Sequence, residues 1–162
     1  MTNNQVLAKS AQSVQDALAT KGLTCRVVEL SESTRTAQDA AKAIGCDVRQ
    51  IVKSLVFKTR MSLRPVLILA SGPNRVNEQL IESLVGEKII KADADFTREV
   101  TGFAIGGIPP IGHKQLIDLT FIDEDLLKFE EIWAAAGTPN AVFALKGKDL
   151  VEMTQGNVIN IQ

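Results

Sequence analysis

The spacing of apolar residues predicts two helices in the first third of the chain. Apolar positions recur at helical spacing over residues 6–21, and Gly22 ends the pattern. A second, alanine-rich helix is expected over residues 37–44, with Thr36 as its N-cap and Gly45 as its C-cap. The local signals for starting and stopping a helix therefore agree with the periodicity.

Strands are predicted where short apolar runs stand between turn residues. The expected strands cover residues 25–30, 51–59, 66–71, 116–122, 141–146 and 158–161. A short helix is predicted over residues 77–85 and a helical turn over 149–154, whereas residues 129–135 fit either an extended or a short helical segment. Because helices and strands alternate irregularly, with hairpin-like pairs between them, we predict an α/β fold of the α+β type. It is a single domain over residues 1–162, whose central mixed, mostly antiparallel sheet is flanked by helices.

Composition excludes several kinds of site. The chain has 162 residues, the usual size of one domain, and 45% of them are apolar. It contains one histidine, no tyrosine and two cysteines, Cys25 and Cys46, which lie far apart. A two-histidine metal site and a Cys-x-x-Cys motif are therefore excluded, and we expect no metal and no cofactor. No apolar run is long enough to span a membrane and no signal-peptide pattern is present, so we expect a cytoplasmic protein.

Charge is distributed unevenly along the chain. The formal net charge of −1 argues against a protein that coats nucleic acid non-specifically. Residues 48–77 nevertheless hold six basic side chains and no acidic one: Arg49, Lys53, Lys58, Arg60, Arg64 and Arg75. Such a region suits either a phosphate-bearing ligand held at one end of the molecule or a solvated strand edge.

Lys53 is the first residue that departs from its local pattern. Strand alternation places it on the same face as Ile51, Leu55 and Phe57, with Lys58 on the opposite, solvated face. An ammonium on an apolar face must meet an anion, reach water or lose its proton. Lys53 is therefore a candidate for binding or catalysis, and the alternative is a lysine near a sheet edge whose stem covers apolar surface.

The second departure is a glycine- and proline-rich loop over residues 102–112. Its adjacent glycines permit backbone conformations closed to other residues, and its two prolines stiffen the exit. We expect the amides of Gly106, Gly107 and Ile108 to be free to hold a carbonyl oxygen or a carboxylate. Neither a phosphate-loop motif nor a dinucleotide-binding glycine motif is present. A rigid structural crossover is the alternative.

Other polar residues near these segments carry weaker signals. His113 directly follows the loop and is a candidate for the mouth of a pocket, although a lone histidine more often packs or faces solvent. The acidic cluster at residues 123–125 is expected to end a strand, and Asp123 is a candidate partner for a basic neighbour. No spacing supports a serine–histidine site.

The strand lysine and the later loop, in this order, resemble the YbaK-like aminoacyl-tRNA deacylases. That family includes the editing domain of bacterial prolyl-tRNA synthetases and its free-standing relatives. The segments that carry the resemblance are Arg35-Thr36-Ala37, Ala40-Ala41, Gly45, Ile51-Val52-Lys53-Ser54-Leu55, Val76-Asn77, Thr101-Gly102, Gly106-Gly107-Ile108-Pro109-Pro110, Gly112, Ile122-Asp123, Ala136-Gly137-Thr138-Pro139 and Asp149-Leu150. The ordered set extends over residues 14–161, nearly the whole chain.

The resemblance implies a metal-independent hydrolase that acts in trans on mischarged tRNA. The expected substrate carries a small amino acid such as Ala, Ser or Cys, and tRNA for proline is the first candidate acceptor. Lys53 is implied to be required for activity, and Gly137 and Thr138 to form a wall of the pocket. The residues implied to hold the aminoacyl group are Gly106, Gly107, Ile108, Pro109 and Pro110. An aminoacyl-tRNA synthetase is a further candidate partner.

Two other functions remain open from the sequence. One is a non-catalytic module that binds tRNA or a synthetase, and the other is a small-molecule ester or amide hydrolase that uses His113. The candidates for contacts with the tRNA acceptor stem are Arg49, Lys58, Arg60, Arg64 and Arg75. The amino acid, the tRNA and the oligomeric state are not fixed by the sequence.

Overall fold

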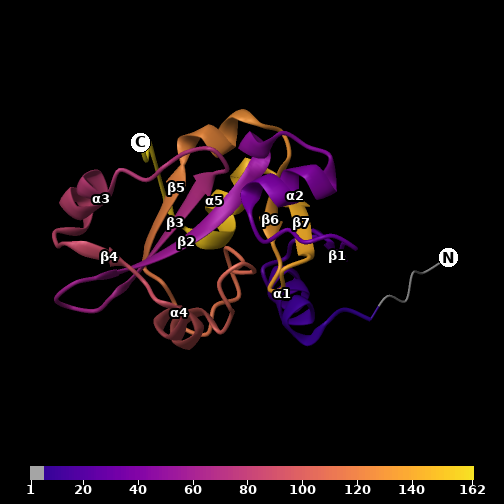
Figure 1. Cartoon of the computed structure of the whole chain (residues 1–162), viewed down its shortest axis with the longest axis horizontal. Helices are drawn as coiled ribbons and strands as arrows, with labels where there is room; N and C mark the ends of the chain where they lie inside the picture. Colours follow the sequence, from indigo (N-terminus) through magenta and orange to yellow (C-terminus); the bar gives the residue numbers. More distant parts are fainter. Residues whose placement is uncertain (1–5) are drawn as a thin grey trace.

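An eight-stranded mixed sheet forms the centre of the computed structural model, which describes residues 6–162 (Figure 1). Its strands are β1 (Val27–Glu29), β2 (Ile51–Thr59), β3 (Pro65–Ser71), β4 (Ile89–Lys91), β5 (Leu119–Asp123), β6 (Ile132–Ala135), β7 (Ala141–Leu145) and β8 (Asn157–Ile159). They lie in the order β1-β7-β6-β2-β3-β5-β8, and β4 pairs with β2 off this path. The pairs β1–β7, β6–β7, β2–β3 and β2–β4 are antiparallel, whereas β2–β6, β3–β5 and β5–β8 are parallel. The predicted mixed, mostly antiparallel sheet is therefore confirmed.

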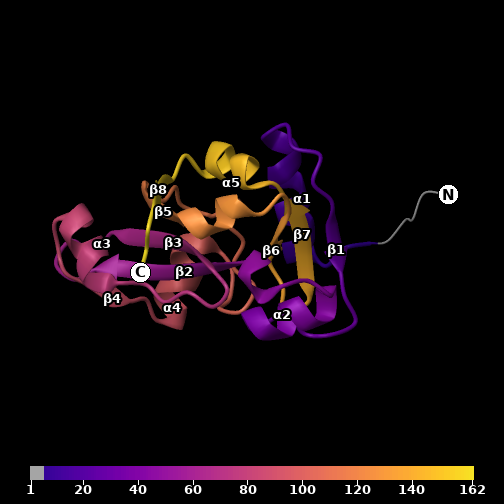
Figure 2. The same ribbon diagram turned by 90° about the horizontal axis from the view of Figure 1, so that it is seen from above.

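Helices flank this sheet on both faces. They are α1 (Lys9–Thr20), α2 (Ala37–Ile44), α3 (Glu78–Val85), α4 (Ala94–Thr101) and α5 (Gly147–Thr154), with short 3₁₀ turns η1 (Val48–Gln50) and η2 (Glu124–Lys128). Seen from above, α2 lies on one side of β6 and β7, and α1 and α5 lie on the other (Figure 2). Within residues 6–162, no helix is both long and apolar enough to cross a membrane.

The two faces of the sheet pack against different partners. One large apolar cluster joins the sheet to α1, α5 and the loop that follows α4, and Phe143 is its largest fully buried side chain. A second cluster on the opposite face includes Phe57 and Ile81 of α3. A third cluster packs the alanines of α2 against Ile51 and Trp133. The face of β2 that carries Lys53 therefore belongs to the second and third clusters, in agreement with the predicted alternation.

Most element boundaries follow the sequence prediction, with definite exceptions. The first helix begins at Lys9 instead of residue 6, and the segment 129–135 contains strand β6, not a helix. The strand expected over residues 116–122 begins at Leu119, and the last strand covers Asn157–Ile159 instead of residues 158–161. Strand β4, helix α4 and both 3₁₀ turns were not predicted. Thr36 does cap α2, since its side chain accepts a hydrogen bond from the Asp39 amide.

Candidate functional site

A gap in the sheet opens onto a pocket. The β2–β6 ladder ends at Val52, and the β2–β4 ladder begins at Phe57. Between these points, the edge of β2 has no strand partner, and a cavity of about 390 Å³ occupies the opening. Its lining comes from the entry to α2, from β2, from the loop near Gly106 and from β6 with its neighbour β7. Four distant segments of the chain therefore meet around one short stretch of β2.

Lys53 projects from this stretch and lines the pocket. Its side chain is half-buried, and its Nζ donates a hydrogen bond to the Asn74 carbonyl oxygen at 2.8 Å. Burial lowers the pKa of the ammonium below its ordinary value; the Asp123 carboxylate opposes this shift, and the Arg75 guanidinium adds to it. Within the described residues no carboxylate pairs directly with Lys53. Two of the three ammonium N–H groups are therefore free to meet a ligand.

The position of Lys53 depends on a polar network behind β3. Asp123 is buried at the end of β5, where it accepts hydrogen bonds from the Ser71 amide at 3.0 Å and from Asn74 Nδ2 at 2.8 Å. The same Asn74 amide group donates to Asp125 at 2.8 Å. These bonds fix the turn whose carbonyl oxygen receives Lys53. Asp123, predicted as a possible partner of a basic residue, therefore binds the turn directly. It positions Lys53 only through that turn.

The glycine–proline loop supplies one wall of the pocket. Gly106 and Ile108 line the cavity, and Gly106 has a positive φ of 101°. The Gly107 amide is not free as predicted, because it donates a hydrogen bond to the Ala104 carbonyl oxygen at 3.2 Å within a turn. No such bond involves the amides of Gly106 or Ile108 among the described residues. Of the three amides that were predicted to be free, those of Gly106 and Ile108 therefore have no backbone partner among the described residues.

The rest of the loop lies behind the pocket wall. Gly107 packs against the Gly137–Thr138 backbone, and the Gly137 amide donates to the Gly107 carbonyl oxygen at 2.8 Å. A Cβ on Gly107 would stand 2.9 Å from backbone atoms of Thr138. Gly137 and Thr138 therefore support the loop, and the cavity is lined beside them by Ala134 and Ala135 of β6. Pro109 and Pro110 also lie outside the lining.

His113 does not stand at the mouth of the pocket. Its Nε2 lies 2.7 Å from the Pro109 carbonyl oxygen, and the residue is absent from the lining of the cavity. Burial lowers the pKa of the imidazole, and the hydrogen bond to Pro109 partly opposes this shift. His113 therefore stabilises the loop through its contact with Pro109. This position gives no support to a hydrolase that uses the histidine in catalysis.

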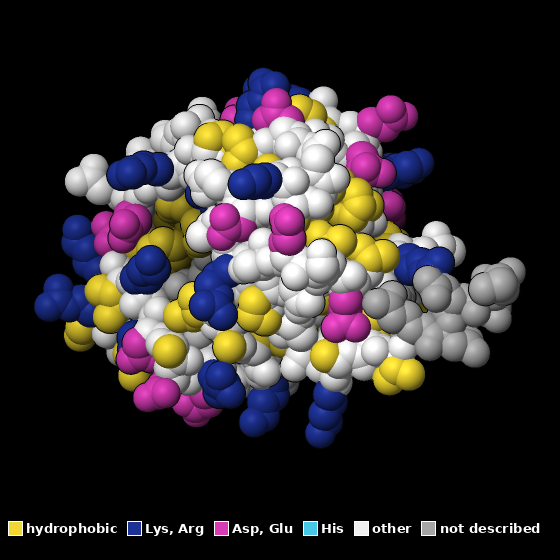
Figure 3. All heavy atoms as spheres, turned by 45° about the vertical axis from the view of Figure 1, so that its right-hand side comes forward, with side chains coloured by type: hydrophobic (Ala, Val, Ile, Leu, Met, Phe, Trp, Pro, Cys, Tyr) yellow, Lys and Arg dark blue, Asp and Glu magenta, His cyan; other side chains and the backbone are white. Residues whose placement is uncertain are grey.

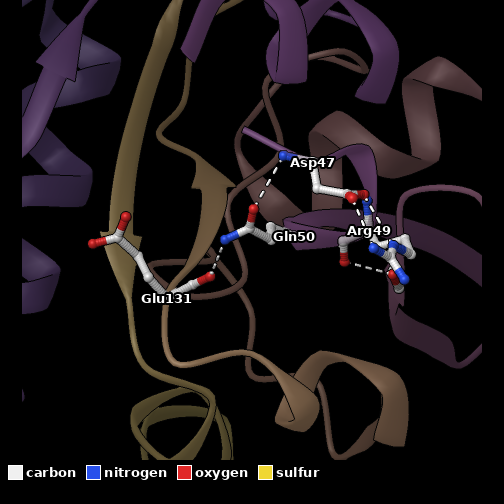
Figure 4. A network of polar contacts seen from close by, with 5 residues as sticks. Asp47, Arg49, Gln50 and Glu131 are labelled. Carbon is white, nitrogen blue, oxygen red and sulfur yellow. Dashed lines mark hydrogen bonds and ion pairs between the residues drawn. The ribbon is translucent and has the colours of Figure 1, made fainter. Parts of the chain in front are cut away.

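The structure does not gather the basic residues of the segment 48–77 in one place. Arg49 forms an ion pair with Asp47 at 2.8 Å at the surface, and its hydrogen bonds lower the pKa of the Asp47 carboxyl to about 2 (Figure 4). Lys58 is less solvated than predicted, because its ammonium lies over the Phe96 ring at 5.0 Å from the centroid. Arg60 and Arg64 lie far along β2, at the exposed turn to β3.

Basic side chains are also scattered on the molecular surface. Basic and acidic side chains are interspersed over the face drawn in Figure 3, which carries no continuous basic surface. Arg75 is the exception among the predicted contacts, since it is close enough to Lys53 to lower the pKa of that ammonium. Any contact with a polyanion is therefore expected at a few separate points.

Among the pocket residues that were not predicted from the sequence as site residues, three have side chains of chemical interest. Arg35 and Trp133 line the cavity, and Ser54 contributes a buried Oγ that has no hydrogen-bond partner among residues 6–162. Arg35 directly precedes the helix cap at Thr36, so the capping signal marked its location but not its role. Trp133 and Ser54 lie in strand patterns that give no sign of the gap. Across the described residues, no group of three or more His, Cys, Asp or Glu side chains is arranged to hold a metal ion.

Fold and site together define an α/β domain with a small, apolar pocket that carries two cations at a break in its sheet. Comparison with known families makes the assignment specific. The chain belongs to the aminoacyl-tRNA editing domain family, whose model matches residues 31–153. The resemblance inferred from the sequence is thereby confirmed.

Individual relatives agree with this assignment. The Bacillus subtilis (strain 168) protein YwhH is 29% identical over 132 residues, which cover 82% of this chain and 83% of that protein. A proline–tRNA ligase of Limosilactobacillus fermentum (strain NBRC 3956 / LMG 18251) is 33% identical over 97 residues, or 57% of this chain and 17% of the ligase. A crystal structure described as a candidate trans-editing enzyme for prolyl tRNA synthetase is 46% identical, with a TM-score of 0.91 over 97% of this chain and 99% of that one.

Proposed function

We propose that the protein hydrolyses the ester bond of mischarged aminoacyl-tRNA, acting in trans on a small amino acid such as Ala, Ser or Cys. The observation that carries this proposal is the pocket itself, because Lys53, Gly106 and Ile108 all line one cavity. Membership of the aminoacyl-tRNA editing family supports the editing activity. The similarity to a structure described as a candidate trans-editing enzyme for prolyl tRNA synthetase favours tRNA for proline as the first acceptor.

The size and lining of the pocket favour a small acyl group. Its volume of about 390 Å³ lies near the lower end of the range of about 300–1,000 Å³ for small-molecule sites. Apolar side chains of Ile44, Ile51 and Trp133 line one part of it. Such a wall accepts a short side chain, and Lys53 stands beside it for the polar end of the substrate.

The chemistry needs no strong nucleophile, because an aminoacyl ester is already activated. The free amides of Gly106 and Ile108 would orient the ester carbonyl and stabilise the oxyanion that forms when water attacks its carbon. Lys53 would bind the phosphate or the ribose of the terminal nucleotide and fix the ester in place. The carbon–oxygen bond to the ribose then breaks, and the ribose oxygen leaves with a proton.

The attacking water requires a proton acceptor, and the substrate itself offers two. We infer that the vicinal ribose hydroxyl or the α-amino group of the amino acid takes part, since His113 is turned away from the cavity. A substrate whose terminal ribose lacks the vicinal hydroxyl separates these groups. Full-rate cleavage of that substrate would remove the hydroxyl from the mechanism.

The decisive experiment measures amino acid release from tRNA for proline charged with Ala, Ser, Cys or Thr. Cleavage of one substrate by the wild type, with loss of activity in Lys53→Ala, is the expected result. Cleavage unaffected by Lys53→Ala would leave the activity but overturn the site. If no substrate is cleaved by folded protein, tRNA binding at low salt separates a binding module from a protein with no affinity for tRNA.

A further inference from the structure

The pocket carries two cations and no anion. Among its lining residues, Arg35 and Lys53 are the charged ones, and no aspartate or glutamate contributes to the wall. Within residues 6–162, neither cation forms an ion pair with a carboxylate. A cavity with this composition is suited to a ligand that brings its own negative charge.

The stem of Arg35 lies directly on the backbone of Gly106. A Cβ built on that glycine would stand 2.9 Å from Arg35 Cγ and 3.3 Å from Arg35 Nε. Only a glycine leaves room for this approach, and its positive φ of 101° turns the loop toward the arginine. Gly106 therefore lines the pocket and also leaves room for the stem of Arg35 to pack against its backbone.

The backbone that carries Arg35 is held on both sides. The Thr34 amide and hydroxyl both donate to the Pro139 carbonyl oxygen, at 2.6 and 3.0 Å. The Arg35 amide donates to Ser33 Oγ at 3.2 Å, and the next residue, Thr36, caps α2. The backbone of Arg35 is therefore fixed and its stem lies against Gly106, while the residue as a whole is exposed and its guanidinium is open to a ligand.

We propose that Arg35 binds the phosphate group on the 5′ side of the terminal nucleoside of the substrate, as the partner of Lys53 across the pocket. This inference rests on the proposed function, in which the ester of the aminoacyl-tRNA occupies the cavity that Arg35 and Lys53 both line. The phosphodiester nearest the ester is the anion that such a substrate brings. A guanidinium binds phosphate through two parallel N–H donors, and the N-terminus of α2 beside it favours the same charge.

The test compares substrates that differ in that phosphate alone. An aminoacyl adenosine lacks it, whereas the same ester of adenosine 5′-monophosphate and the charged tRNA carry it. Arg35→Ala should lower kcat/KM about 10- to 100-fold on the two phosphate-bearing substrates and change it less than about twofold on the aminoacyl adenosine. Arg35→Lys should recover part of the loss, because it keeps the charge without the fork.

A matched control and a binding measurement complete the design. Arg26→Ala removes an exposed arginine that does not line the pocket, and it should behave as wild type on every substrate. Equal losses on substrates with and without the phosphate, or no loss on either, would overturn the proposal. If the wild type cleaves nothing, the proposed function fails, and titration with adenosine 5′-monophosphate against adenosine decides Arg35 separately. Tighter binding of the monophosphate by the wild type, lost in Arg35→Ala, supports the phosphate contact; an unchanged preference overturns it.

Discussion

At the scale of single residues, Lys53 combines a half-buried position with a charge that is not paired to a carboxylate. Replacing it by Met should reduce hydrolysis about 100-fold or more, because the substrate loses its anchor. The free energy of unfolding should change by no more than about 1 kcal/mol, since the loss of the bond to Asn74 is offset by the removal of a partly desolvated charge. Lys148→Met, which changes an exposed lysine outside the lining of the pocket, is the control, and steady-state kinetics with urea unfolding checks both variants.

Gly107 tests the support of the loop without touching the pocket. Gly107→Ala places a Cβ 2.9 Å from the Thr138 backbone, and it should destabilise the protein by about 1–3 kcal/mol and lower activity as the loop shifts. Gly86→Ala is the matched control, because Gly86 has a positive φ of 86° but open space around its Cβ. It should cost about 1 kcal/mol of strain and leave kcat/KM intact. Equal kinetic behaviour of the two variants would contradict the role of Gly107.

His113 makes stability depend on pH in a defined direction. Burial lowers the pKa of the His113 imidazole in the folded state. As the pH falls through about 6.5, the imidazole of the unfolded chain therefore becomes protonated while that of the folded protein stays neutral. Stability should therefore fall as the pH drops below about 6.5 toward the folded-state pKa. Urea midpoints at pH 7.5 and 5.5 measure this change, and His113→Gln should reduce it. An identical pH dependence in the variant would show that other groups cause it.

At the scale of elements, the β2–β3 hairpin extends away from the pocket to an exposed turn. Glu87 accepts hydrogen bonds from the Met61 and Ser62 amides and thereby fixes this turn. Seven residues separate Arg60 from Lys53, which corresponds to roughly 23 Å along a strand. We propose that the arginines of the turn meet the acceptor stem when the ester occupies the pocket.

The hairpin arginines should matter for tRNA and not for a small ester. A double Arg60→Ala, Arg64→Ala variant should lower kcat/KM about 10-fold on charged tRNA and leave an aminoacyl adenosine unaffected. The salt dependence of tRNA binding should also become shallower by about two phosphate contacts. A double Arg26→Ala, Lys148→Ala variant removes the same charge elsewhere on the surface. Equal effects of both double variants on tRNA would indicate net charge instead of a contact.

The sequence predicted the long elements because each has strong local signals. Helix α2 has a side-chain cap and a C-terminal glycine, β3 is a nearly continuous apolar run, and β2 is an apolar segment interrupted by Lys53, Ser54 and Lys58. Helix α4 was missed although Asp93 caps it, because two of its three buried residues are threonines, Thr97 and Thr101. A buried threonine does not register as apolar in a periodicity. Strand β4 has three residues, too few for any alternation.

At the scale of the whole molecule, the pocket exists only because β6 and β4 leave a gap along β2. Local patterns identified Lys53 and the loop, and the fold does bring Lys53, Gly106 and Ile108 to one cavity. They could not show that the Gly107 amide would be used within a turn, or that Arg35 would lie on Gly106. The first feature is the conformation of a local turn between Ala104 and Gly107, for which the residue types alone give no sign. The second depends on a contact between two segments that lie about seventy residues apart, which only the assembled fold brings together.

The open stretch of β2 has a further consequence. An edge without a partner carries backbone donors and acceptors that can accept a strand from another chain. In this protein the start of α2 and the Gly106 loop line the same cavity as that edge, so an incoming strand would have to displace them. A variant that loosens α2 would leave the same few residues to recruit a second molecule by strand addition. The proposed site of recognition is therefore also a place where the sheet can accept a strand from a second molecule.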